Sequence, residues 1–242
     1  MAQVIYYLPG HGGKLDSALG KELMRRGFDI AGRSTTGEFN QLSFSDQVQT
    51  VANDLENGFW FEDAKIVANS FGAYLFLHAQ GLISPFVGKV LLLSPIVGEF
   101  TNEEKMMSFA PPKADELKDL VDSGNYPTPN NIEMHVGSED WQSDPDSVKA
   151  LGRKLGINYT VVPKEGHSLS KTYVGSILDR WLILRYFRVK KIEVYFKVVQ
   201  SSLIKTANTF VILSNSNKNP HKGQNPWTRV FYLNPRSLIE AN

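Results

Sequence analysis

Residues 64–81 of this 242-residue chain predict a strand, then a sharp turn that carries a serine, then a helix. The rest of the fold must accommodate this unit. The apolar run 66–68 has the composition of a buried strand. Residues 73–80 are good helix formers, and Gly81 follows them as a stop signal. On such a turn the Ser70 hydroxyl stands clear of the backbone, near the next N–H group and the positive end of the helix.

Small residues flank this serine at the two positions where such a turn needs them. A strained turn brings neighbouring backbone close, and Ala68 and Gly72, two residues before and two after Ser70, leave room for it. The arrangement is that of a nucleophile elbow, although glycine is usual at both positions. The alternative is a plain strand, turn and helix in which Ser70 only caps the helix. The rest of the sequence is needed to distinguish a nucleophile elbow from a helix-capping serine.

Strand and helix patterns alternate on both sides of this unit. Apolar or β-branched runs predict strands at residues 3–8, 28–32, 66–68, 89–94, 132–136 and 157–162. Helical periodicity and capping residues predict helices at 16–26, 45–57, 73–80, 145–155 and 170–184. This alternation predicts an α/β protein with a doubly wound, mainly parallel sheet. Ligands of such sheets bind outside the carboxyl ends of the strands.

Three side chains of complementary chemistry are expected at the carboxyl ends of three strands, in the order Ser70, Asp140, His167. A serine is a weak nucleophile until a histidine takes its proton. A carboxylate must hold that imidazole in the correct tautomer and stabilise its charged form. The order matches that of a serine hydrolase triad on a doubly wound sheet. The three residues are therefore the candidate catalytic group.

The glycine-rich loop 9–13, after the first strand, is expected to supply part of an oxyanion site. Acyl transfer needs two donors for the developing negative charge. The N–H of Phe71, at the start of the elbow helix, is the first candidate. The N–H of Gly13 is the second, with Gly12 as its substitute. His11, in the same loop, is expected to orient it and to contact the substrate.

Other residues of these types have plainer explanations. Glu139 is a serious alternative to Asp140 as the carboxylate, whereas Asp144 is better explained as a helix cap. Ser94 also ends a strand, but the proline after it lacks the N–H group that an elbow would supply. The remaining histidines are interpreted as structural or as part of the C-terminal tail: His78, His135 and His221. No two histidines have metal-ligand spacing and no glycine-rich phosphate loop is present, so no metal and no cofactor are expected.

Residues 1–184 resemble a small, cap-poor α/β-hydrolase. The matching segments are 9–13 (Pro-Gly-His-Gly-Gly), 68–72 (Ala-Asn-Ser-Phe-Gly), 93–95 (Leu-Ser-Pro), 137–140 (Gly-Ser-Glu-Asp) and 166–167 (Gly-His). The chain begins at the strand before the oxyanion loop, so the resemblance implies a compact sheet of about six strands. It also implies serine-dependent hydrolysis through an acyl-enzyme, most often of carboxylic esters, without a cofactor.

The expected function is hydrolysis of small carboxylic esters by the Ser-His-Asp triad. A non-catalytic relative that binds a ligand or partner in the same cleft is one alternative, and a thioesterase or lactonase with the same triad is another. The alternation lapses in residues 96–131, which are either a small lid over the cleft or a surface excursion with a short helix at 115–122. Three side chains there are candidates for an acyl pocket: Met106, Met107 and Phe109.

Composition places the chain among globular proteins, with 42% hydrophobic and 21% charged residues. It holds no cysteine, no apolar run of 18 residues and no recognisable signal peptide, so a cytoplasmic location without a membrane span is expected. Residues 185–242 hold ten basic and two acidic residues, a net charge of +8, against −7 for residues 1–184.

The basic segment 185–242 is expected to be a β-rich appendage, because residues 191–199 alternate like a strand. Alternatives are a surface for nucleic acid or an acidic partner, and sequence foreign to the hydrolase part. No recognised nucleic-acid motif supports the first, so nucleic acid is not an expected partner. The expected partner is a small ester substrate, and nothing in the pattern indicates an oligomeric state.

Overall fold

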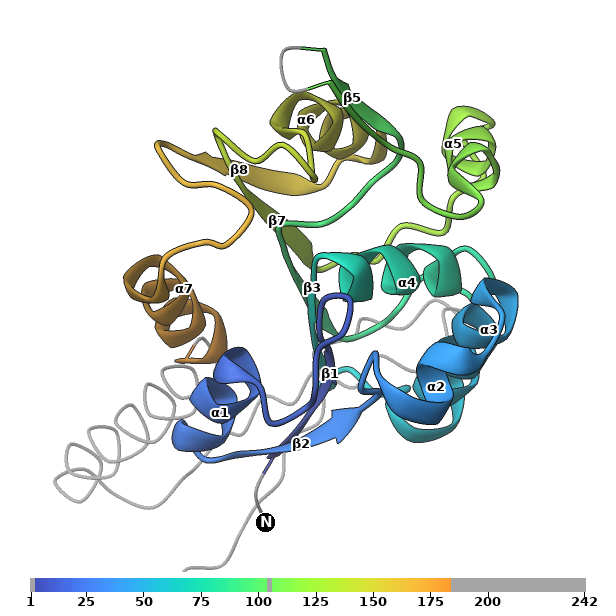
Figure 1. Ribbon diagram of the computed structural model, residues 1–242. Helices are drawn as coiled ribbons and strands as arrows, with labels where there is room; N and C mark the ends of the chain where they lie inside the picture. Colours follow the sequence, from blue (N-terminus) through green and yellow to red (C-terminus); the bar gives the residue numbers. More distant parts are fainter. Residues whose placement is uncertain (1–2, 104–105, 184–242) are drawn as a thin grey trace, which may run out of the picture. The chain divides into compact units, whose positions relative to one another are not determined.

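The computed structural model describes residues 3–103 and 106–183 (Figure 1). The chain divides at Arg180 into two units, and the first, Met1–Arg180, contains the sheet and the candidate site. The extension predicted at 185–242 lies outside the described residues. No helix in the described part is both long enough and apolar enough to cross a membrane.

Six strands form one sheet in which every neighbouring pair is parallel. Their order across the sheet is β2 (Phe28–Gly32), β1 (Gln3–Leu8), β3 (Lys65–Asn69), β4 (Lys89–Leu93), β7 (Ile132–Gly137) and β8 (Asn158–Val162). The order reverses direction at β1, because β2 lies on one side of it and the later strands lie on the other. The prediction of a doubly wound, parallel sheet of about six strands is confirmed.

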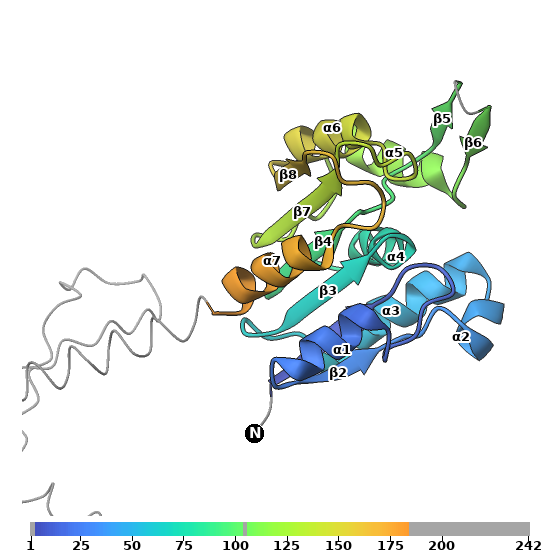
Figure 2. The ribbon, with the colours of Figure 1, turned by 60° about the vertical axis from the view of Figure 1, so that its left-hand side comes forward.

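Helices cover both faces of this sheet. On one face, alternate strand residues such as Leu8, Ala68 and Leu92 join a hydrophobic core with α3 (Phe44–Gly58), α4 (Phe71–Gln80), α5 (Ala114–Asp122) and α6 (Pro145–Leu155). The other face carries α1 (Ala18–Arg25) and α7 (Lys171–Ile183), which lie side by side in Figure 2. Arg26, just after α1, donates to Asp179 of α7 and joins these two helices.

Capping residues explain where several helices begin. Ser17 accepts from the N–H of Gly20 at the start of α1, and Ser43 accepts from the N–H of Asp46 at the start of α3. Asp144 accepts from the N–H of Ser147, and proline occupies the first position of α6, as the sequence predicts. The predicted helices and strands therefore agree with the structure to within a few residues at each end.

The segment between β4 and β7 contains more structure than the sequence indicates. Its predicted helix is α5, and before it lies an antiparallel hairpin of β5 (Phe100–Asn102) and β6 (Met107–Phe109). The hydroxyl of Tyr74 donates to the carbonyl oxygen of Pro112 at 2.7 Å, which attaches the segment to α4. The short helix α2 (Gly37–Gln41) was also not predicted. Elements of three to five residues show too little periodicity to be recognised.

Candidate active site

Ser70 lies at the tip of the turn between β3 and α4 in a strained backbone conformation, with φ of 53° and ψ of −119°. A non-glycine residue adopts a positive φ only where its surroundings enforce it. Here the N–H of Ser70 donates to the Leu93 carbonyl, and its own carbonyl accepts from the N–H groups of Ala73 and Tyr74. The side chain of Ser70 caps no helix N–H group, contrary to the plainer interpretation of this serine.

Glycines make this turn possible by letting backbone segments touch. A Cβ atom at Gly72 would lie 2.3 Å from the carbonyl oxygen of Leu8 and 2.5 Å from that of Pro9. A Cβ atom at Gly10 would lie 3.2 Å from the Cβ of Ser70. The loop after β1 therefore passes directly beside the serine, and the need for a small residue two positions after Ser70 has a steric cause.

The three predicted side chains form one hydrogen-bonded chain. Ser70 Oγ lies 2.8 Å from His167 Nε2, and His167 Nδ1 lies 3.0 Å from both carboxylate oxygens of Asp140. Asp140 is only 2% exposed, and its Oδ1 accepts from the N–H groups of Gln142 and Ser143 at 2.9 Å each. Glu139, the alternative carboxylate, is exposed on the surface.

The environment of Asp140 keeps its carboxyl group ionised. Burial acts to raise the pKa of this carboxyl, but the hydrogen bonds from His167 and from the N–H groups of Ser143 and Gln142 outweigh burial. Together they hold the pKa of Asp140 below its ordinary value. An ionised carboxylate beside Nδ1 favours the tautomer in which Nε2, facing Ser70, accepts a proton.

Ser143 belongs to this network, although no sequence pattern indicates it. It is 1% exposed, and its hydroxyl donates to the Ser94 carbonyl oxygen at 2.7 Å and lies 3.3 Å from His167 Nδ1. Its N–H also donates to Asp140. One residue therefore joins the loop after β7, the end of β4 and the histidine. Only its position three residues after Asp140 could have indicated this role.

In the loop of residues 9–13, the N–H of Gly13 already donates hydrogen bonds within the protein. This group donates to the Gly10 carbonyl oxygen and to Thr35 Oγ1, at 2.9 Å in both cases. The hydroxyl of Thr35, which is 1% exposed, itself donates to the Gly10 carbonyl oxygen. In this conformation the predicted role of Gly13 as an oxyanion donor needs revision, because its N–H already has two acceptors. The N–H of Gly12, the predicted substitute, has no acceptor among the described residues.

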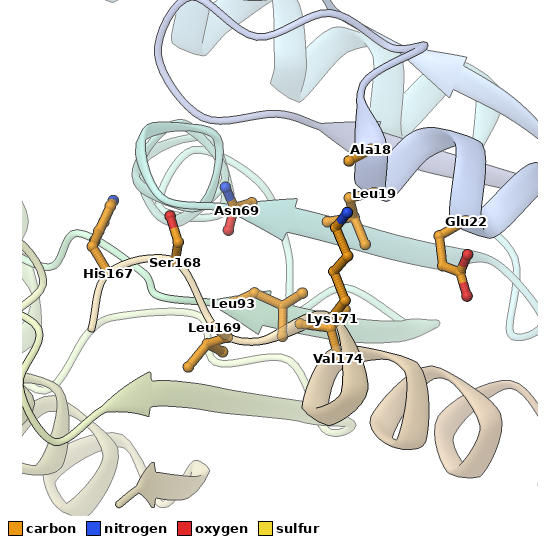
Figure 3. Close-up of a pocket in the computed structure, with 10 residues that line it drawn as sticks. All are labelled: Ala18, Leu19, Glu22, Asn69, Leu93, His167, Ser168, Leu169, Lys171 and Val174. Atoms are coloured by element: carbon orange, nitrogen blue, oxygen red, sulfur yellow. The ribbon is translucent and has the colours of Figure 1, made fainter. Parts of the chain in front are cut away.

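A cavity of about 390 Å³ opens beside His167, between α1, α7 and the ends of β3 and β4 (Figure 3). None of the side chains predicted to bind substrate lines it. The ring of His11 instead lies edge-on to that of Phe71, with 5.7 Å between ring centres. Met106 is 94% exposed at the hairpin turn, Met107 lies on β6, and Phe109 packs partly buried against the main core.

Two further histidines belong to the framework, His135 buried and His78 partly buried. His78 packs between the rings of Phe44 and Tyr74, and burial lowers the pKa of its imidazole to about 4. His135 Nδ1 lies 2.9 Å from the hydroxyl of Tyr173 on α7. Among the described residues, no three His, Asp or Glu side chains are grouped so that they could hold a metal ion.

Comparisons with known proteins identify the fold. No protein-family model and no curated protein matches the sequence. Among solved structures, a monoacylglycerol lipase from Paleococcus ferrophilus has a TM-score of 0.56 at 12% identity, over 74% of this chain and 93% of that one. Mouse α/β hydrolase domain-containing protein 10 has a TM-score of 0.54 at 13% identity, over 74% and 89%. The ydeN gene product of B. subtilis has 0.53 at 15% identity, over 75% and 99%.

These similarities, together with the six-stranded parallel sheet, show that the chain has the α/β-hydrolase fold. The fold implied by the sequence resemblance is thereby confirmed. At 12–15% identity the similarity concerns the fold alone, because one fold carries many different activities.

Proposed function

We propose that this protein is a serine hydrolase that cleaves small carboxylic esters through an acyl-enzyme on Ser70. The observation that supports the proposal most strongly is the unbroken hydrogen-bonded chain from Ser70 Oγ through His167 to the buried Asp140. Ser70 lies on a strained turn with φ of 53°, and its side chain caps no helix N–H group. A serine held in this way is a nucleophile with its base already in contact.

The reaction proceeds in two halves. Ser70 Oγ attacks the acyl carbon while His167 Nε2 takes the hydroxyl proton, and the tetrahedral intermediate then expels the alcohol, to which His167 returns the proton. Water attacks the resulting acyl-enzyme by the same route and releases the acid. Asp140 stays ionised throughout, orients His167 and stabilises its charged form.

The N–H groups of Phe71 and His11 supply the oxyanion site in this proposal. Phe71 directly follows the nucleophile and opens α4. In the peptide between Gly10 and His11, the carbonyl points into the loop toward Gly13 and Thr35. Because C=O and N–H point in opposite directions in a trans peptide, the N–H of His11 points out of the loop. Gly10 lies against Ser70, so this N–H is better placed than that of Gly13.

Hydrolysis of p-nitrophenyl acetate and butyrate tests the proposal. We expect turnover by the wild-type chain and a loss on the order of 10⁴-fold or more in kcat for Ser70→Ala. The exposed Ser45→Ala is the matched control and should retain wild-type rates. A fluorophosphonate probe should label the wild-type chain but not Ser70→Ala. A folded wild-type protein with neither turnover nor labelling would exclude catalysis and favour a binding function for the same cleft.

A further inference from the structure

Apart from His167, the cavity beside this histidine is lined by residues outside the triad and the loop 9–13. It lies on the sheet face that carries α1 and α7, and its volume of about 390 Å³ falls within the range of small-molecule sites. Half of its ten lining residues are apolar: Ala18, Leu19, Leu93, Leu169 and Val174. The other five are polar: Glu22, Asn69, His167, Ser168 and Lys171.

The lining indicates which part of an ester the cavity receives. His167 lines the cavity, whereas Ser70, Phe71 and the loop 9–13 do not. In acyl transfer the leaving oxygen must lie against the histidine that protonates it, while the acyl carbonyl oxygen lies against the oxyanion donors. A group that fills this cavity and touches His167 is therefore on the alcohol side of the ester.

The two charged residues of the cavity are not equivalent. Glu22 accepts hydrogen bonds from Arg25, at 2.6 Å from Nη2, and from Arg26. Hydrogen bonds from these two arginines lower the pKa of Glu22 to about 2, so its negative charge is permanent and already paired. Lys171 has no ion pair and no hydrogen bond with any described residue, and Figure 3 shows it extending from the start of α7 across the cavity toward α1. The unpaired charge in this cavity is positive.

Asn69 adds a hydrogen-bonding group close to the reacting atoms. It is the residue immediately before Ser70, and its side chain projects into the cavity (Figure 3). Its carboxamide has no hydrogen-bond partner among the described residues, so both its donor and its acceptor are available to a ligand. From His167 to Lys171 the cavity thus offers a proton donor, an amide, an apolar wall and a cation.

We propose that this cavity binds the leaving alcohol and selects alcohols that carry a carboxylate at their far end, which Lys171 pairs with. The inference rests on the proposed function and names its substrates as O-acylated hydroxy acids. Ser70 Oγ bonds to the acyl carbon and the bond from that carbon to the alcohol oxygen breaks. The serine proton passes through His167 to the departing alkoxide, and the hydroxy acid leaves the cavity.

A comparison of two acetate esters isolates the contribution of the leaving alcohol. 5-Acetoxypentanoate carries the distal carboxylate and pentyl acetate does not, but both form the same acetyl-enzyme, so a difference in kcat/KM reports the leaving alcohol alone. We expect the wild-type chain to prefer the anionic ester about two- to fivefold, the effect of one ion pair with the exposed Lys171. Salt at about 1 M should reduce this preference by screening.

Substitutions at position 171 assign the preference to one side chain. Lys171→Met keeps the apolar stem and removes the charge, and should bring the ratio of the two kcat/KM values to about one. Lys171→Arg should restore most of the preference. Lys21→Met, which removes an exposed charge from α1 outside the cavity lining, is the matched control and should leave the ratio at its wild-type value.

Binding to an inactive chain gives a second, independent readout. The full-length Ser70→Ala protein should bind 5-acetoxypentanoate in a calorimeter about two- to fivefold more tightly than the Ser70→Ala, Lys171→Met double variant does. An equal ratio of rates in wild type and Lys171→Met, or equal binding by the two inactive chains, would overturn the inference. If p-nitrophenyl acetate turnover nevertheless depends on Ser70, the proposed function stands. Absence of that turnover would overturn both.

Discussion

The hydroxyl of Ser143 donates a 2.7 Å hydrogen bond to the carbonyl oxygen of Ser94, and so joins the carboxylate loop to the end of the strand beside the elbow. The N–H of Ser143 donates to Asp140 at the same time. The position of the carboxylate therefore depends on a residue that takes no part in proton transfer. The end of β4 supports the triad in two ways, because Leu93 also accepts from the N–H of Ser70.

Ser143→Ala should weaken this support without removing any member of the triad. The Ser94 carbonyl oxygen would lose its buried partner, which costs about 1 kcal/mol and lowers Tm by about 2–4 °C in a domain of this size. We expect kcat for p-nitrophenyl acetate to fall about fivefold because the Asp140 loop becomes less ordered. Ser123→Ala is the control, since it removes a similar bond to a carbonyl oxygen on an exposed helix end. Wild-type kcat in Ser143→Ala would show that the loop is held by other contacts.

Asp140→Asn should abolish most of the activity while Glu139→Gln leaves it intact. An asparagine side chain cannot stabilise the imidazolium and allows the wrong tautomer, so a loss on the order of 10³-fold or more in kcat is expected. The carboxylate of Glu139 lies exposed on the surface, although this residue was the serious alternative on sequence grounds. Steady-state kinetics with p-nitrophenyl acetate, supported by circular dichroism of each variant, measures the difference. A larger loss in Glu139→Gln would reverse the assignment.

The sequence predicted the framework because its pattern is regular. Continuous apolar runs fill the centres of the strands predicted at 66–68 and 89–94, as is typical of strands in a sheet covered on both faces. The order of Ser70, Asp140 and His167 at strand ends required only that strands be recognised. The hairpin of β5 and β6 was missed because each strand has three residues.

The finer parts of the site depend on tertiary contacts that have no local pattern. The acceptors of the Gly13 N–H include Thr35, which is 22 residues further along the chain. Ser143 binds a carbonyl 49 residues before it. The cavity is built from α1, α7 and two strand ends, so no single segment indicates it. Met106 was predicted to line a pocket from its apolar character, but the hairpin turn leaves it exposed.

His78 should make the stability of the fold depend on pH between about 7 and 4. Its imidazole is held neutral by burial, with a pKa of about 4 against 6.5 in an unfolded chain. The unfolded state therefore binds a proton as pH falls through 6.5, whereas the folded state does not until about pH 4. The stabilisation is complete above pH 6.5 and is lost progressively as pH falls toward 4.

Urea unfolding at pH 7 and pH 5 measures this effect. The wild-type chain should lose more free energy of unfolding between the two pH values than His78→Gln, because the other titrating groups contribute equally to both chains. The nearby charges of Glu116 and Lys113 act on the imidazole in opposite directions, so burial decides the sign. Equal losses in the two chains would show that His78 titrates in the same way folded and unfolded.

Thr35 offers a way to test the oxyanion loop, whose donors are backbone groups that no side-chain substitution removes. Its hydroxyl accepts from the N–H of Gly13 and donates to the carbonyl of Gly10, so it fixes the peptide that carries the N–H of His11. Thr35→Val keeps the shape and removes both bonds. We expect kcat for p-nitrophenyl acetate to fall about tenfold with little change in KM, because an oxyanion donor acts mainly in the transition state. Thr35→Ser keeps the hydroxyl and should retain most of the activity. If Thr35→Val instead raised KM and left kcat unchanged, the loop would contribute to substrate binding and not to the oxyanion site.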